Sequence, residues 1–283
     1  MHCPAPKLSP PPPDTPTATR PAQVWRVDGN HVIADTDQLI EEIPVALVYN
    51  GISHAVLLAT PADLEDLALG FSLSEGILAS RAELYDAEQV PGSRGIELHL
   101  EISSERFAGL KARRRNLAGR TGCGLCGVES LDALARPHPH LPSHAPVPIA
   151  AAFAGLAALP GHQPLRQTTG AVHAAAWIGR DGAIRALRED VGRHNALDKL
   201  LGHLAATRFD PTDGFVLVSS RASYEMVQKT LALGIGSLVA VSAPTGLAVD
   251  LARESGLGLA GFARDRRMVI YAGPERFSPV DQT

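Results

Sequence analysis

The chain has 283 residues, of which 45% are hydrophobic and 20% charged, and its formal net charge is −4. This composition is typical of a soluble globular protein, and the length allows one large domain or two smaller ones. The weak negative charge argues against broad nucleic-acid binding. No apolar stretch approaches the ~20 residues of a membrane span, and the N-terminus lacks the apolar core of a secretion signal. We therefore expect a cytoplasmic protein that binds neither nucleic acid nor membrane.

The N-terminal part of the chain predicts a tail followed by a β-hairpin. Residues 1–20 are rich in proline and predict a disordered tail, with order beginning near Val24. The segments 43–49 and 52–58 are rich in apolar residues and flank Asn50-Gly51. This dipeptide is the strongest short signal for a tight hairpin turn.

The next segments predict two helices with a strand between them. Thr60-Pro61 indicates the start of an amphipathic helix that runs to about Gly76, with the threonine hydroxyl as its cap. Residues 96–102 alternate between apolar and polar and predict a strand. A basic helix follows over about 105–116.

The segment 137–149 is rich in proline and histidine and marks the clearest internal boundary. Its histidines, His138, His140 and His144, are candidate metal ligands, but a solvated linker explains them better because nothing rigid fixes their geometry. The predicted organisation is a tail (1–20), an N-terminal α+β region (21–136), this linker (137–149), an α/β domain (150–277) and a C-terminal tail (278–283).

The C-terminal region predicts an α/β fold with a mixed sheet flanked by helices. Two apolar segments around Arg180–Gly182 indicate a second hairpin, and 215–219 is the continuous apolar run of a strand buried on both faces. Further elements follow in the order β-β-α-β-α-β-α-β-β. Their expected ranges are helices 192–204, 222–233 and 246–254 and strands 238–242, 257–263 and 268–272.

Cys123 and Cys126 form a CxxC pair in a glycine-rich loop, and the chain has three cysteines in all. A disulfide framework is not expected in a reducing compartment, so these residues are candidates for reactive thiols or metal ligands. A structural zinc site would need two further ligands from histidines, and a thioredoxin-like pair would need a strand-to-helix junction. An inert, buried cysteine pair is disfavoured by the surrounding glycines, which predict an open loop. The fourth interpretation is a nucleophilic thiol that carries a transferable group.

Basic residues directly precede the two thiols. Cations this close would favour thiolate over thiol and lower the pKa of Cys123 below its ordinary value. A solvated helix face explains the same charges without any role in chemistry, so both interpretations stay open. The residues are Lys111, Arg113, Arg114, Arg115 and Arg120.

Four blocks of sequence, taken together, resemble the FdhD family of sulfurtransferases required for formate dehydrogenase activity. The resemblance runs in order from about Val24 to Phe277. The blocks are R-T-G-C-G-L-C-G at 120–127, E-D-V-G-R-H-N-A-L-D-K-L at 189–200, S-S-R-A-S-Y-E-M-V-Q-K at 219–229 and S-A-P-T-G-L-A-V-D-L-A at 242–252.

The resemblance implies a sulfur carrier. Such a protein takes sulfane sulfur from a cysteine desulfurase and holds it as a cysteine persulfide. It then delivers the sulfur to the molybdenum cofactor of formate dehydrogenase, in the bis(molybdopterin guanine dinucleotide) form. Cys123 would bear the persulfide, and Cys126 would relay or resolve it. A homodimer is also implied, and no resident metal is expected.

The resemblance also implies a cytidine-deaminase-like fold for the C-terminal domain, without deaminase chemistry. The deaminase zinc ligands come from two helix starts, which correspond here to 193–196 and 220–223. His194 is present, but Ala196 stands in place of the catalytic glutamate, and Ser220 and Ser223 stand in place of two thiolates.

A guanine dinucleotide needs cations and helix N-termini for its phosphates. By resemblance, the cofactor site is assigned to Phe262, Ala263, Arg264, Asp265, Arg266 and Arg267. Without the resemblance, this basic stretch would be explained as a solvated turn. Arg193 and Arg221, each near a helix start, are secondary candidates for phosphate contact.

Two other functions stay open for the protein as a whole. One is a cofactor-binding chaperone with regulatory thiols, and the other is a thiol-disulfide oxidoreductase.

Overall fold

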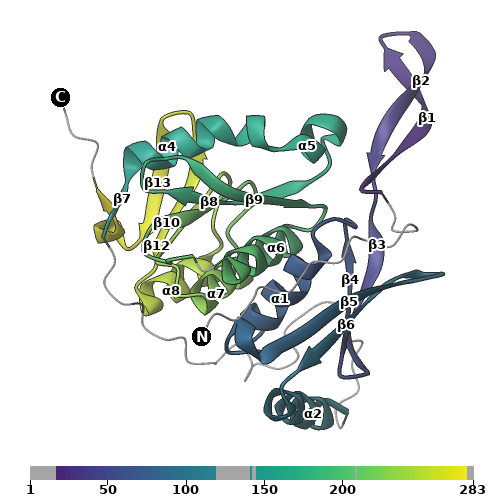
Figure 1. Cartoon of the computed structure of the whole chain (residues 1–283). Helices are drawn as coiled ribbons and strands as arrows, with labels where there is room; N and C mark the ends of the chain where they lie inside the picture. Colours follow the sequence, from purple (N-terminus) through teal and green to yellow (C-terminus); the bar gives the residue numbers. More distant parts are fainter. Residues whose placement is uncertain (1–16, 119–140, 142–144, 208, 279–283) are drawn as a thin grey trace.

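The computed structural model describes residues 17–118, 141, 145–207 and 209–278. These residues form two packed halves and a projecting arm (Figure 1). In the N-terminal half, four strands pair in the order β4-β3-β6-β5 and pack against α1 and α2. The bounds are β3 Ile43–Tyr49, β4 Ile52–Ala59, α1 Leu64–Ser74, β5 Leu84–Gly92, β6 Gly95–Ile102 and α2 Ser104–Ala118, with a short 3-10 turn at Arg81–Glu83.

The predicted first hairpin is confirmed. β3 and β4 pair antiparallel, and the turn residues Asn50 and Gly51 have φ values of 45° and 80°. Both are in the left-handed region that a two-residue turn of this kind requires, which asparagine and glycine adopt most readily. The strand predicted at 96–102 and the basic helix are confirmed as β6 and α2, whereas β5 was not predicted.

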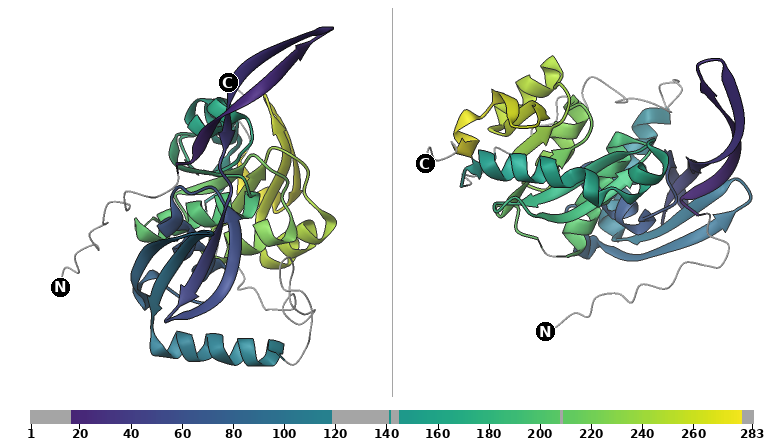
Figure 2. Two further views of the ribbon diagram at one scale, coloured as in Figure 1. Left: turned by 90° about the vertical axis from the view of Figure 1, so that its right-hand side faces the viewer. Right: turned by 90° about the horizontal axis from the view of Figure 1, so that it is seen from above.

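The arm is a two-stranded antiparallel ribbon of β1 (Thr19–Asp28) and β2 (His31–Ile40). It extends away from both halves in the views of Figures 1 and 2. The sequence indicated order from near Val24, but β1 begins at Thr19, inside the segment assigned to the tail. Residues 1–16 lie outside the described residues.

The C-terminal half contains the predicted mixed sheet, with strand order β13-β12-β11-β10-β8-β9. Helices α6, α7 and α8 cover one face and α4 covers the other, so each face contributes to a separate apolar cluster (Figure 1). The predicted β-β-α-β-α-β-α-β-β order is confirmed. The bounds are β8 His173–Gly179, β9 Ile184–Asp190, α6 Arg193–Ala206, β10 Gly214–Val218, α7 Tyr224–Ala232, β11 Ser237–Ala240, α8 Gly246–Ser255, β12 Gly258–Arg264 and β13 Arg267–Ala272.

The segment between the halves is more structured than a solvated linker. Leu141 is buried in the cluster beneath α6–α8, and Val147 in β7 (Val147–Pro148) pairs with Phe277 in β14 (Phe277–Ser278). Two helices that the sequence did not predict follow, α4 (Ile149–Ala158) and α5 (Pro164–Thr169), with a 3-10 turn at Leu159–His162 between them. His138, His140 and His144 lie outside the described residues.

The two halves meet through close contact of α1 and α6. A Cβ atom added to Gly70 would lie 1.8 Å from the backbone oxygen of Asp198, and one added to Gly202 would lie 1.9 Å from that of Asp66. Only glycine permits the two backbones to approach so closely. The halves therefore form one packed body rather than two independently moving domains.

A buried polar network reinforces this junction. The carboxylate of Asp190 accepts hydrogen bonds from the Thr60 backbone N–H at 3.0 Å and from Lys199 Nζ at 2.6 Å. Lys199 also donates to the Thr60 carbonyl oxygen, and Asn195 Nδ2 donates to the Leu58 carbonyl oxygen. Asp190 and Lys199 are both fully buried. The network fixes the loop that leads into α6.

The predicted cap of α1 was wrong. The helix begins at Leu64 rather than directly after Pro61, and its N-cap Asp63 adopts a left-handed conformation without a side-chain cap. The Thr60 hydroxyl instead accepts the backbone N–H of Val191, from the other half of the molecule. The Thr60 hydroxyl, which the local sequence pattern assigned to the cap of α1, therefore bonds to a residue that is distant in the sequence.

Candidate functional site

The carboxyl edge of the six-stranded sheet gathers most of the predicted site residues. β10, β11 and β12 are mutually parallel, and β9 has the same direction because both β9 and β10 are antiparallel to β8. These four strands therefore end at one edge, and α6, α7 and α8 begin there. In open α/β sheets, ligands bind in the crevice outside the carboxyl ends of the strands. We take this edge as the candidate site.

The helix starts at this edge are held in place by backbone hydrogen bonds between neighbouring loops. The N–H of Ser242 donates to the carbonyl oxygen of Ser220, and that of Thr245 donates to the carbonyl oxygen of Ala222. Thr245 is the N-cap of α8 and its hydroxyl accepts from the Ala248 N–H. The positive ends of the helix dipoles are thus fixed near one another, an arrangement that favours anions.

The predicted stretch 262–267 forms the end of β12 and its turn into β13, at the same edge. Phe262 has a φ of 50° and is 45% exposed, and its N–H donates to the Ser242 carbonyl oxygen at 3.2 Å. This bond ties the stretch to the loop before α8. Neighbouring strands lie about 4.8 Å apart, so the ends of β10 and β12 are separated by roughly 10 Å. One ligand can therefore contact both.

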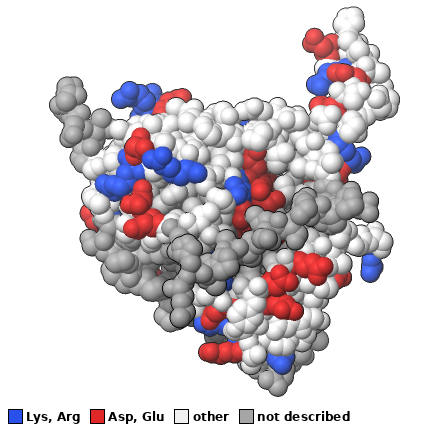
Figure 3. Space-filling model, in the orientation of Figure 1, with Lys and Arg blue, Asp and Glu red and all other residues white. Residues whose placement is uncertain are grey.

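The residues of the 262–267 stretch are not equally accessible. Arg264, Asp265, Arg266 and Arg267 are exposed, with Asp265 at a φ of 52° in the turn. The side chain of Ala263, by contrast, is fully buried in the cluster beneath α4. It supports the turn from inside and is not available to a ligand. Figure 3 shows basic side chains interspersed with acidic ones on the side of the molecule where β12 and β13 lie in Figure 1.

A second group of cations lies at the start of β8 and α6. Burial lowers the pKa of His173, and the nearby positive charges of Arg193, Arg166 and His194 lower it further. The Nε of Arg193 is buried and has no hydrogen-bond partner among the described residues. His173 and Arg166 were not predicted, because they become neighbours of Arg193 only through the pairing of β8 with β9.

His194 contacts two residues of the α7 start, yet the three do not form a proton relay. Its Nε2 lies 2.6 Å from a carboxylate oxygen of Glu225 and 3.5 Å from the Ser223 hydroxyl. A relay needs the base and its orienting group on opposite ring nitrogens, whereas both contacts here use Nε2. The hydrogen bond from His194 lowers the pKa of Glu225. The group therefore joins the starts of α6 and α7.

The positions that would hold zinc in a deaminase lie near these two helix starts, since α6 begins at Arg193 and Ser223 is the N-cap of α7. Within the part of the chain that the structure describes, no group of three or more histidine, cysteine, aspartate or glutamate side chains is arranged to hold a metal ion. The likeness to a deaminase fold itself stays a prediction.

Cys123 and Cys126 lie outside the described residues. The described chain on either side ends at Ala118, the last residue of α2, and resumes at Leu141, whose N–H donates to the Ser255 carbonyl oxygen at the C-terminal end of α8. Of the basic residues, Lys111 Nζ lies 4.5 Å from the centre of the Phe107 ring. The expected effect of these cations on thiol pKa stays a prediction.

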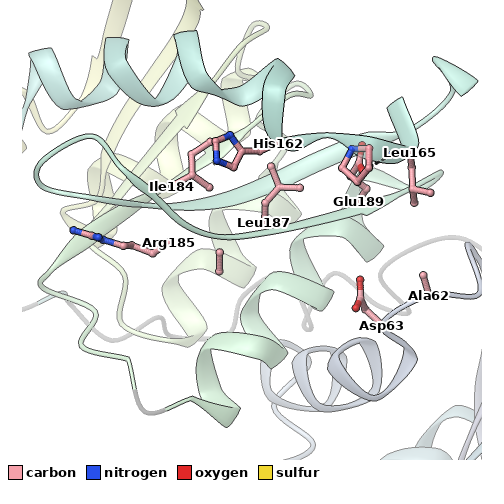
Figure 4. Close-up of a pocket in the computed structure, with 10 residues that line it drawn as sticks. Ala62, Asp63, His162, Leu165, Ile184, Arg185, Leu187 and Glu189 are labelled. Atoms are coloured by element: carbon pink, nitrogen blue, oxygen red, sulfur yellow. Dashed lines mark hydrogen bonds between the residues drawn. The ribbon is translucent and has the colours of Figure 1, made fainter. Parts of the chain in front are cut away.

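A cavity of about 410 Å³ lies beside the edge strand β9, between it and the loop before α1 (Figure 4). Its buried acid, Glu189, accepts the backbone N–H groups of Leu165 and Arg166 at 2.9 and 3.0 Å. Glu189 thereby binds the start of α5. Because both carboxylate oxygens serve this purpose, Glu189 is not a free acid for chemistry, and the carboxyl edge remains the better candidate.

The fold and this edge define the class of the protein, a mixed α/β protein with a sheet edge suited to anions. A model of the FdhD/NarQ family matches residues 40–278. The chain belongs to this family. None of the helices among the described residues is long and apolar enough to cross a membrane.

Curated relatives support this assignment. A sulfur carrier protein FdhD from Bordetella petrii is 56% identical over 90% of this chain and 92% of its own. Proteins of the same name from Cupriavidus necator and Chromobacterium violaceum are each 57% identical, over 89% and 84% of this chain and 87% and 89% of theirs. The crystal structure of a candidate formate dehydrogenase accessory protein from Desulfotalea psychrophila has a TM-score of 0.73 at 22% identity. That match covers 92% of this chain and all of the other, and it confirms the fold.

Proposed function

We propose that the protein is a sulfur carrier that serves a formate dehydrogenase. It accepts sulfane sulfur from a cysteine desulfurase on Cys123 and delivers it to the molybdenum cofactor bound at the carboxyl edge. Family membership supports the carrier role, because relatives at 56–57% identity are named sulfur carrier proteins. The observation that carries the cofactor site is the convergence of three helix starts with exposed arginines at one edge.

The sulfur transfer is a thiol exchange. The Cys123 thiolate attacks the terminal sulfur of the desulfurase persulfide, the bond between the two donor sulfurs breaks, and the desulfurase leaves as a thiolate. The sulfane sulfur changes carrier without net oxidation or reduction. Cys126, the second thiol of the CxxC pair, relays or resolves the persulfide formed on Cys123.

The residues at the carboxyl edge suit a guanine dinucleotide as the bound substrate. Arg264, Arg266 and Arg267 are exposed and supply cations for its phosphates, and the positive charge of Arg193 lies at the start of α6 on the same edge. The exposed ring of Phe262 offers an apolar face for a base. Arg221 is exposed two residues before the N-cap of α7 and is a further phosphate contact.

Two assays, one of GDP binding and one of sulfur loading, test the proposal. Replacing Arg264, Arg266 and Arg267 with alanine should weaken binding of GDP, used as the probe, by about tenfold or more, because one charge-assisted contact is worth roughly 1.5–3 kcal/mol. Calorimetry measures this affinity. The matched control replaces Arg180, Arg185 and Arg253, which lie away from the carboxyl edge, and should bind GDP like the wild type.

The second assay follows sulfur. Incubation with a cysteine desulfurase and cysteine should add one sulfur to the wild type and to both arginine variants, and none to Cys123→Ala, as measured by mass spectrometry. A protein that binds GDP but never gains sulfur would be a cofactor-binding chaperone. One that forms only a reducible disulfide would be a thiol-disulfide oxidoreductase. Either result contradicts the proposal.

A further inference from the structure

A second polar group lies at the junction of the two halves, where α1, α6 and β9 meet. Arg188 comes from β9, Asp66 from α1 and His203 from the end of α6. The close approach of the two helices brings the last two together, because Gly202 lies against the backbone oxygen of Asp66 (Figure 1). All three side chains are partly buried rather than sealed from water, so a solvent proton can reach them.

Arg188 connects the other two side chains. Its guanidinium contacts the Oδ2 atom of Asp66 through two nitrogens, at 2.8 and 2.7 Å, and donates to the Nδ1 atom of His203 at 2.7 Å. A guanidinium can only donate hydrogen bonds, so Nδ1 must be the acceptor. His203 is therefore neutral in this arrangement, with its hydrogen on Nε2.

A proton added to His203 is incompatible with this arrangement. A protonated Nδ1 cannot accept from Arg188, and it places a second positive charge beside the guanidinium. The same Nδ1 lies 3.7 Å from Oδ2 of Asp66, so the two cations compete for one carboxylate oxygen. Asp63, the N-cap residue of α1, offers a second acceptor, because its carboxylate lies 3.5 Å from the Nε of Arg188.

We propose that Arg188, His203 and Asp66 form a proton-sensitive latch between the two halves. When His203 takes a proton from solvent, it becomes the partner of Asp66, and Arg188 moves to Asp63. Arg188 lies in the strand that leads to the carboxyl edge, and Asp66 lies in the helix of the other half. The exchange therefore loosens the connection between them. The proposal does not depend on sulfur transfer.

The electrostatics of the junction agree with the geometry. The charged groups that act on His203 are Arg188 from β9 and Asp66 and Asp63 from α1 and its cap. Burial lowers the pKa of His203 and Arg188 lowers it further, while the two carboxylates oppose the change. Burial also raises the pKa of Asp66, so this carboxylate depends on a neighbouring cation.

The direction of the pH dependence follows from the lowered pKa of His203. As pH falls, the unfolded chain binds the proton before the folded protein does. The stability that the closed latch supplies is thus present above the usual histidine pKa of 6.5 and is lost as pH falls through the lower pKa of the folded protein.

NMR titration of His203 in the full chain tests the partners. Arg188→Met removes a cation and frees Asp66, so it should raise the pKa of His203 by about half a pH unit or more. Asp63→Asn removes a carboxylate and should lower the pKa. Asp181→Asn is the control, because Asp181 is an exposed aspartate that pairs with another arginine of β9, Arg185, and should leave the pKa unchanged. Shifts in the same direction for the first two variants would overturn the proposal.

Hydrogen exchange of the α1 amides tests the loosening. After correction for the intrinsic pH dependence, the wild type should exchange about tenfold faster at about pH 5.5 than at about pH 7.5. His203→Asn keeps an acceptor near the position of Nδ1 but cannot be protonated, so it should lose this rise. His162→Asn is the control and should behave like the wild type, because the Nδ1 of His162 contacts the Ala158 carbonyl oxygen rather than a charged group. Circular dichroism checks that each variant is folded. An equal rise in the wild type and His203→Asn would overturn the proposal.

Discussion

The E-D-V-G-R-H-N-A-L-D-K-L block at 189–200 serves two regions that differ sharply. Asp190 and Lys199 lie in the buried junction between the halves, whereas Arg193 and His194 lie at the carboxyl edge. The buried residues satisfy one another, but the Arg193 Nε has no partner among the described residues. A single motif therefore combines residues that hold the two halves together with residues at the carboxyl edge, where His194 joins the starts of α6 and α7.

The largest expected effect comes from the junction. Lys199→Met leaves the Asp190 carboxylate buried without its cation and should lower the free energy of unfolding by about 3–5 kcal/mol. Urea denaturation measures this loss. Arg266→Met, at the exposed turn, is the control and should change the free energy by less than about 0.5 kcal/mol. Equal stability of the two variants would contradict the division into two regions.

The close contact between α1 and α6 predicts an intermediate effect on the free energy of unfolding. Gly70→Ala places a Cβ atom 1.8 Å from the Asp198 oxygen, so α1 and α6 must separate, at a cost of about 1–3 kcal/mol. Gly109→Ala in α2 is the control, because nothing lies within 4 Å of the new atom. Alanine should stabilise that helix by about 0.5–1 kcal/mol. Thermal unfolding should thus move in opposite directions for the two variants.

The smallest effect concerns protons at the carboxyl edge. Burial and nearby cations lower the pKa of His173, so Arg193→Ala should raise it, as NMR titration would show. Arg266→Ala is the control and should leave it unchanged. Because the pKa is lower in the folded state, the unfolded chain binds the proton first as pH falls. Stability from this residue is present above its usual pKa and declines below it. An unaltered titration in Arg193→Ala would remove Arg193 from this cluster.

The elements with local signals were predicted from the sequence. Asn50-Gly51 specifies its own turn, and the apolar run at 215–219 predicted β10 because a central strand is buried on both faces. Thr60 misled the prediction of the α1 cap, since its hydroxyl bonds to Val191 across the junction. The periodicity of a short segment carries no information about a hydrogen-bond partner that is so distant in the sequence.

In the candidate site, too, residues with a local sequence signal were predicted, and residues brought together by the topology were not. The turn at 262–267 was assigned through resemblance, and the topology places it at the sheet edge with the starts of α6 and α7. His173 and Glu225 were missed because each joins the site through strand or helix pairing rather than through its neighbours in sequence.

The junction also has a consequence for synthesis on the ribosome. Thr60 and its partner Asp190 are separated by 130 residues, and Ser74 and its partner Lys229 by 155. At about 5–20 residues per second, α1 emerges many seconds before the residues that satisfy its buried polar groups. During this interval the N-terminal half exposes the apolar and polar surface that α6 later covers. The contact between α1 and α6 can therefore form only late in synthesis, after most of the C-terminal half has emerged.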